Sequence, residues 1–146
     1  DLEALTSGRA IARDYGNGAT TKEVFSAYNK GDSKAINVIE KAAKNFARGL
    51  ASINAILDTK VFVIGGSVFM NNKDILLPLI EKEFYKSFPV FSKGVEIKSS
   101  ALDKYLGDIA ALSLVMPDDW VKDWHDKKPW EQAPKPIILD KNGNEV

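Results

Sequence analysis

The chain has 146 residues and 45% hydrophobic side chains, enough for one ordinary hydrophobic core. Twenty basic and twenty acidic side chains cancel, so the net charge predicts neither a nucleic acid nor an anionic membrane as partner. The chain has no cysteine, which excludes a disulfide framework and a thiolate metal site, and its single histidine cannot form a histidine cluster by itself. The absence of cysteine fits a reducing, cytoplasmic setting.

The start of the chain does not look like the start of a protein. It lacks an initiator methionine, and no basic segment leads into an apolar one. No apolar run anywhere approaches the roughly 20 residues of a membrane span. We therefore expect a fragment whose beginning was removed.

Two helical segments are predicted before residue 31. Apolar residues recur at helical spacing from Leu2 to about Tyr15, with an interruption near Gly8. Thr20 or Thr21 then caps a second helix over residues 22–30, because a hydroxyl at this position satisfies a free backbone N–H of the first turn.

The longest predicted helix starts at Asp32, whose carboxylate suits a helix N-cap. Gly49 lies inside it and costs about 1 kcal/mol relative to alanine. Either a neighbouring element approaches the backbone closely there, or the glycine is a tolerated defect. The apolar stripe of this helix consists of Ile36, Ile39, Ala43, Phe46, Leu50, Ile53 and Leu57.

The following elements alternate between strand and helix. Residues 61–64 form a continuous apolar run rich in β-branched side chains, which predicts a strand covered on both faces. A helix over residues 74–87 follows, capped by Asp74. Residues 95–98 alternate between apolar and charged, which predicts a strand with one wet face, and residues 101–115 return to helical spacing. This order predicts an α/β fold.

The composition changes at Pro117. From this residue to the end of the sequence lie all three tryptophans and four of the six prolines. We expect an appendage on the surface, anchored to its own domain by the tryptophans rather than offering them to a sugar or base. Within it, only residues 137–139 resemble a strand. His125 has no acid–base partner at a fixed spacing, so we expect a solvated surface histidine rather than a proton shuttle.

A paired-glycine turn follows the first predicted strand in the run VFVIGGSV, residues 61–68. Two glycines leave backbone N–H groups bare and allow a flat or phosphorylated ligand to come close. Open α/β sheets bind ligands at this carboxyl edge of their strands. The glycine spacing is that of neither a dinucleotide fingerprint nor a P-loop. From the residues alone, a simple tight turn and a ligand-binding turn both remain open.

Several motifs in the same order resemble the ROK family, named for its repressors, open reading frames and sugar kinases. The helix over residues 32–57, the turn over residues 58–60 and the strand into Gly65 and Gly66 resemble that family's sequence. Earlier in the chain, Leu2-Glu3 resembles the end of the family signature, which ends Gly-Cys-x-Glu. In all, the likeness covers about residues 2 to 115.

The resemblance implies the C-terminal lobe of the actin-like, ribonuclease H-like ATPase fold, with an incomplete sheet flanked by helices. This lobe would occupy residues 1–116, and residues 117–146 would be a C-terminal extension with no recognised counterpart. In the family, the segment written here as VFVIGGSV is the adenosine motif, so Gly65, Gly66 and Ser67 are expected to border the nucleotide. Ser67 departs from the glycine that the family often has at its position.

Two N-terminal residues carry further expectations. Glu3 matches the signature glutamate that hydrogen-bonds sugar hydroxyls in ROK sugar kinases, and an ionised carboxylate suits that role because it accepts from two hydroxyls at once. Judged by position alone, Glu3 is only a favourable charge near a helix start. Asp1 stands where the family usually has a zinc-ligand cysteine, so zinc is either absent from this member or lost with the preceding part.

The implied activity is phosphorylation of a hexose or N-acetylhexosamine by ATP with Mg²⁺. The catalytic base and the phosphate-binding loops would lie upstream, so we assign no catalytic residue and no metal ligand and expect the chain alone to be inactive. Its expected partners are a small sugar and ATP, with no nucleic acid and no membrane, and a homodimer because ROK proteins commonly dimerise. Two alternatives remain: the sugar-sensing domain of a ROK repressor, and an interaction domain without nucleotide chemistry.

Overall fold

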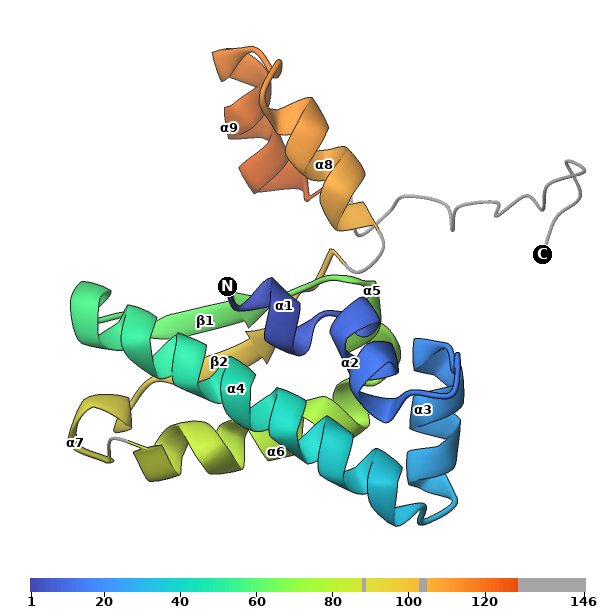
Figure 1. The fold of residues 1–146 in the computed structure, drawn as a ribbon. Helices are drawn as coiled ribbons and strands as arrows, with labels where there is room; N and C mark the ends of the chain where they lie inside the picture. Colours follow the sequence, from blue (N-terminus) through green and yellow to red (C-terminus); the bar gives the residue numbers. More distant parts are fainter. Residues whose placement is uncertain (88, 103–104, 129–146) are drawn as a thin grey trace, which may run out of the picture. The chain divides into compact units, whose positions relative to one another are not determined.

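The structure of the protein, a computed structural model, describes residues 1–87, 89–102 and 105–128. The contacts divide the chain into two compact units, Asp1–Lys104 and Tyr105–Val146, and each is described by itself. Among the described residues, no helix combines the length and the hydrophobicity needed to cross a membrane. The elements of the first unit are α1 (Glu3–Thr6), α2 (Gly8–Tyr15), α3 (Thr21–Asn29), α4 (Ser33–Leu57), β1 (Val61–Ile64), α5 (Ser67–Asn71), α6 (Lys73–Ser87), α7 (Pro89–Ser92) and β2 (Glu96–Ser99), and those of the second are α8 (Leu106–Ser113) and α9 (Asp118–Lys127) (Figure 1).

The predicted starts of the first long helices are confirmed by their caps. Thr20 caps α3: its hydroxyl accepts a hydrogen bond from the backbone N–H of Glu23 at 3.3 Å, and the Glu23 carboxylate accepts from the Thr20 N–H at 2.7 Å. Asp32 caps α4, with Oδ1 accepting from the Ala35 N–H at 2.7 Å. The predicted interruption of the first helical segment is also confirmed, because α1 and α2 are separate helices that meet at Ser7.

Helix α4 buries part of the predicted stripe, including Ala43, but not its C-terminal end. Ile39 and Leu50 are buried as expected, but Ile53 is 41% and Leu57 67% exposed. Small side chains carry much of the buried face instead, and they allow α6 to pack along α4. The buried residues of α4 are Ala35, Ile39, Ala42, Ala43, Ala47, Leu50, Ala51 and Asn54.

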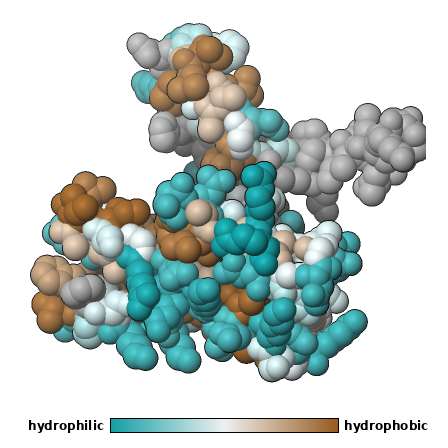
Figure 2. All heavy atoms as spheres, viewed as in Figure 1, coloured by the Kyte–Doolittle hydropathy of each residue, from teal (hydrophilic) through white to brown (hydrophobic). Residues whose placement is uncertain are grey.

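Strands β1 and β2 pair in parallel, from Val61 opposite Glu96 to Ile64 opposite Ser99. The predicted wet face of β2 is confirmed, since Glu96 and Lys98 are exposed while Ile97 is 6% exposed. The prediction that β1 is covered on both faces is wrong for the described part of the chain, because Val63 is 64% exposed. The described helices of this unit cover only the other face of the strand, and Figure 2 shows apolar surface over the start of β1 and the end of α4.

The core of the first unit lies between this two-stranded sheet and the helices (Figure 1). Phe84 of α6 is 1% exposed, and its ring meets the ring of Phe62 of β1 edge-on at 5.9 Å between centroids. The predicted α/β fold, an incomplete sheet flanked by helices, is therefore confirmed. Helix α6 starts at Lys73, one residue earlier than predicted, so Asp74 lies in its first turn rather than at the N-cap.

The second unit contains a helix that the composition did not predict. α8 is shorter than the predicted segment over residues 101–115, and α9 occupies part of the predicted surface appendage. Trp120 and Trp124, four residues apart on α9, line a hollow of about 370 Å³ together with Leu112 and Val115. The predictions for Trp130, for the strand at residues 137–139 and for the side chain of His125 lie outside what the structure describes.

Candidate functional site

The paired-glycine turn connects β1 to the short helix α5. Before it, Ile64 is 6% exposed, and after it Phe69 is also 6% exposed, so both ends of the turn are anchored in the core. Gly66 has φ +98° and ψ 148°, a backbone conformation that residues other than glycine rarely adopt. A Cβ added at Gly66 would meet no atom within 4 Å, so the backbone conformation, and not the available space, requires glycine there.

One side of this turn opens onto an apolar pocket of about 280 Å³. Its volume lies close to the lower end of the range for small-molecule sites. The turn after β1 and the turn between α1 and α2 both contribute to its lining, together with α4 and α6. The lining residues are Thr6, Ser7, Gly8, Ile11, Ala42, Ala43, Phe46, Ile64, Gly65, Gly66, Ser67, Val68, Phe69, Leu76 and Ile80.

The other side of α5 faces a larger and more polar groove of about 750 Å³. Ser67 and Val68 line both hollows, so the start of α5 is a wall that they share. No local sequence pattern predicts this groove, because α3 and α5 are far apart in the chain. Its lining residues are Thr21, Lys22, Phe25, Ser26, Asn29, Lys30, Ser67, Val68, Asn71 and Asn72.

A tight junction of three helix starts separates the pocket from the groove. The hydroxyl of Thr21 donates a hydrogen bond to the Gly8 carbonyl at 2.7 Å. A Cβ added at Gly8 would lie 2.9 Å from Oγ1 of Thr21 and 3.0 Å from Cγ2 of Val68. Glycine is therefore needed at the start of α2 so that α2, α3 and α5 can approach one another closely.

Glu3, the predicted sugar-contacting residue, lies on α1, and its side chain is exposed. Within residues 1–87, 89–102 and 105–128, its carboxylate makes no hydrogen bond or ion pair, so both oxygens are available as acceptors. Thr6, at the other end of the same helix, lines the apolar pocket. The fold thus brings the helix that carries Glu3 to the pocket that Gly65, Gly66 and Ser67 border.

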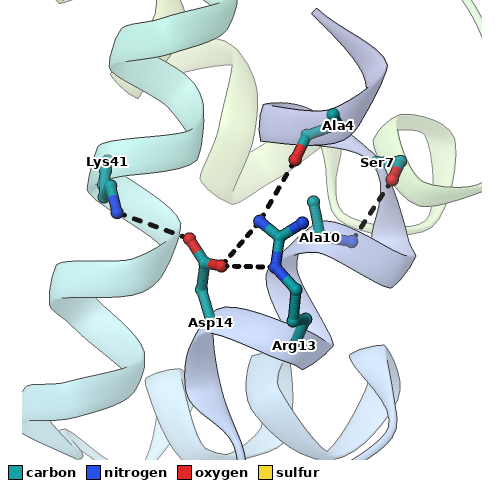
Figure 3. Close-up of polar contacts among 6 residues, drawn as sticks. All are labelled: Ala4, Ser7, Ala10, Arg13, Asp14 and Lys41. Atoms are coloured by element: carbon teal, nitrogen blue, oxygen red, sulfur yellow. Dashed lines mark hydrogen bonds and ion pairs between the residues drawn. The ribbon is translucent and has the colours of Figure 1, made fainter. Parts of the chain in front are cut away.

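A set of polar contacts ties α1 to α2 and α2 to α4 (Figure 3). The Arg13 guanidinium donates to the Ala4 carbonyl at 3.1 Å and to the Asp14 carboxylate at 2.7 Å, and Lys41 of α4 lies 3.4 Å from the other Asp14 oxygen. The hydrogen bond from Arg13 is the main cause that lowers the pKa of the Asp14 carboxyl below its ordinary value; burial acts against it, and the charge of Arg13 and the contact with Lys41 add smaller lowering effects. Asp14 is therefore ionised at neutral pH.

The described residues contain no group of three or more His, Asp or Glu side chains that could hold a metal ion. The Asp1 carboxylate accepts a hydrogen bond from the Ala4 N–H, in the first turn of α1, at 2.8 Å. Asp1 alone does not make a zinc site. We assign no metal-dependent step to the residues of this chain.

Comparison with known families supports the resemblance that the motifs suggested. The sequence profile of the ROK family matches residues 2–115. The chain is 35% identical over 106 residues to a glucokinase of Aeropyrum pernix, covering 71% of this chain and 33% of that protein. It is 35% identical over 125 residues to an N-acetylmannosamine kinase of Haemophilus influenzae, covering 84% of this chain and 38% of that protein.

The fold is also found in a solved structure. A ROK family glucokinase from Streptomyces griseus, crystallised with glucose and AMPPNP, matches 77% of this chain and 43% of its own length with a TM-score of 0.66 at 22% identity. At this identity the likeness concerns the fold alone. The chain spans little more than a third of the length of the curated relatives that it matches.

Proposed function

Because this chain belongs to the ROK family, we propose that it is the C-terminal part of an ATP-dependent sugar kinase, hereafter the parent protein. In this proposal Gly65, Gly66 and Ser67 border the adenosine of ATP, and Glu3 accepts hydrogen bonds from the sugar. The lobe over residues 1–116 supplies one side of the cleft, and residues 117–146 form an extension to it.

The observation that carries the proposal is the open turn after β1. Gly66 has a backbone conformation that favours glycine, and the space beside it is open, so a ligand could approach the backbone of this turn closely. The turn follows the carboxyl end of a parallel strand, where open α/β sheets bind their ligands. An apolar pocket and a polar groove flank it, which suits a purine base joined to a ribose.

The geometry of Glu3 supports the sugar-binding part of the proposal. A carboxylate that already served a structural ion pair would have to give it up before it could bind a sugar. The Glu3 carboxylate has no such partner among the described residues, and it is carried by α1, whose last residue, Thr6, lines the pocket. Two free oxygens on one side chain accept from two neighbouring hydroxyls, the pattern that a hexose ring presents.

The chemistry of the proposed reaction is largely a matter of placement. A base outside this chain would take the proton of a sugar hydroxyl, and that oxygen would attack the γ-phosphorus of ATP in line with the departing ADP. Mg²⁺ would supply charge neutralisation on the phosphates when bound. The residues of this chain hold the two reactants: the glycine turn holds the adenosine, and Glu3 orients the sugar. The chain by itself should therefore be inactive.

The names of two relatives support two classes of sugar as the proposed substrate. One relative is a glucokinase and another an N-acetylmannosamine kinase, so the proposed substrate is a hexose or an N-acetylhexosamine. The proposal includes a cytoplasmic setting, where ATP is available, and leaves a homodimer as an expectation of the family.

A coupled assay for ADP release tests the proposal. The parent protein is incubated with ATP and Mg²⁺ and with glucose, mannose, N-acetylglucosamine or N-acetylmannosamine, and the isolated chain of residues 1–146 is assayed in parallel. We expect one sugar to give turnover with the parent protein and none with the isolated chain. Sugar binding without phosphorylation would favour the repressor, and binding of neither sugar nor ATP would favour the interaction domain; either result contradicts the kinase.

A further inference from the structure

The place of Glu3 depends on a helix that cannot hold itself in place. α1 has only four residues, Glu3–Thr6, and none of them is buried. An isolated helix of this length is unstable in water, because a single turn fixes several residues for very few hydrogen bonds. The position of α1, and with it that of the Glu3 carboxylate, must therefore be set by contacts with the rest of the unit.

The first such contact joins Leu2 to Gly49 in the middle of α4. A Cβ added at Gly49 would lie 2.8 Å from Cδ2, 3.1 Å from Cδ1 and 3.5 Å from Cγ of Leu2. The whole end of the leucine side chain thus sits over the glycine, and rotation of one methyl group would not clear the contact. Leu2 precedes Glu3 directly, so this packing contact helps to place α1.

This contact explains a glycine that is otherwise unfavourable. Gly49 lies inside a 25-residue helix, where it costs about 1 kcal/mol relative to alanine. The neighbouring small positions on the buried side of α4, Ala47 and Ala51, are alanines. Of the two interpretations that the sequence left open, the close approach is therefore the correct one, and the approaching group is a side chain.

The second contact is the hydrogen bond from Arg13 to the Ala4 carbonyl, shown in Figure 3. Asp14 holds the same guanidinium through both Nε and Nη2, at 2.9 and 2.7 Å. Asp14 in turn pairs with Lys41 on α4. Both contacts of α1 therefore lead to α4, one through packing and one through charged groups.

We propose that Gly49 and Arg13 are positioning residues, which fix α1 so that the Glu3 carboxylate faces the sugar. The inference rests on the proposed function of Glu3. Gly49 makes room for Leu2, which precedes Glu3, and Arg13 donates a hydrogen bond to the carbonyl of Ala4, which follows Glu3. Neither residue touches the sugar itself.

The substitution Gly49→Ala in the parent protein tests this inference. The new methyl group displaces the end of the Leu2 side chain and weakens the packing that places α1, so we expect the KM for the sugar to rise roughly tenfold while the KM for ATP stays unchanged. The melting temperature should not fall, since alanine is the better helix former. Gly107→Ala is the matched control: this glycine lies in α8, a Cβ there meets nothing within 4 Å, and neither KM should change.

A compensating change separates positioning from a general structural role. Leu2→Val removes one carbon where Gly49→Ala adds one, so the double variant should recover most of the sugar affinity. Arg13→Gln should raise the KM for the sugar by a smaller factor, about twofold to fivefold, because its hydrogen bond lies at the surface.

Glu3→Gln distinguishes failure of this inference from failure of the proposed function. If Glu3→Gln raises the KM for the sugar and Gly49→Ala does not, the positioning role is wrong and the role of Glu3 stands. If Glu3→Gln has no effect on sugar kinetics, both are wrong. A parallel rise of both KM values in Gly49→Ala, without rescue by Leu2→Val, would also overturn the inference.

Discussion

Two turns border the same 280 Å³ pocket, and different forces hold them. The turn after β1 lies between Ile64 and Phe69, which are both buried in the core. The turn between α1 and α2 follows a helix with no buried residue, attached mainly through Leu2 and Arg13. We therefore expect substitutions near the first turn to change the stability of the whole unit. Substitutions on α1, which precedes the second turn, should change the place of α1 at little cost in stability.

The largest expected effect is at the anchor of the first turn. Phe69→Ala removes a buried aromatic ring and should lower the free energy of unfolding by about 3–5 kcal/mol. Leu5→Ala on α1 is the matched change beside the second turn, and because Leu5 is 47% exposed it should cost within about 0.5 kcal/mol. Urea-induced unfolding of the two variants measures the difference. Similar losses of unfolding free energy in the two variants would contradict the expected difference between the two turns.

Two hydrogen-bonding residues, Asn54 before β1 and Thr6 on α1, extend the comparison between the core-anchored segment and α1. Asn54 is 4% exposed; its amide donates to the Phe91 carbonyl at 2.7 Å, and its side-chain oxygen accepts from the Thr59 N–H at 3.0 Å, which fixes the entry to β1. Asn54→Ala should cost about 1–3 kcal/mol. Thr6→Val removes the bond from Thr6 to the Leu2 carbonyl on α1 and should cost about 1 kcal/mol or less. The account fails here if Thr6→Val is the more damaging change in thermal unfolding.

The smallest expected effect is the pH dependence that Asp14 confers on the α1 attachment. Because folding lowers the pKa of this carboxyl, its stabilising contribution is present above the ordinary value of 3.8 and is lost as the pH falls through the lower value of the folded state. Asp14→Asn should cost under about 1 kcal/mol at neutral pH, and the difference from wild type should vanish in acid. Unfolding free energies measured along a pH series test this; a difference that persists in acid would mean that charge is not its source.

Much of the fold was predictable because local chemistry and tertiary packing agree. Thr20 and Asp32 cap the helices that follow them, and the spacing of apolar residues located α4 correctly. The exposed face of β1 was not predictable, because an apolar run does not show whether the elements that cover both faces of the strand belong to the same part of the chain. Helix α9 was missed because prolines and charges dominate the composition of the tail, although Pro117 only precedes the helix.

The site was predictable in part. The pattern of Gly65 and Gly66 after a buried strand pointed to the turn, but not to what lies beside it. Lys22 and Asn71 reach the groove through the packing of α3 and α5, which no local sequence pattern encodes. The role of Gly49 was left between two interpretations for the same reason, since its partner Leu2 is distant in the chain.

The most direct test of the central proposal compares two glycines with the same backbone requirement. Gly66 and Gly94 have φ +98° and +85°, and a Cβ at either meets nothing within 4 Å, but only Gly66 lines the pocket. Valine at either position should cost a similar 1–3 kcal/mol or so of strain. Calorimetric titration of AMPPNP into the parent protein should show at least about a tenfold loss of affinity for Gly66→Val and none for Gly94→Val. Equal affinities in the two variants would contradict a nucleotide site at this turn.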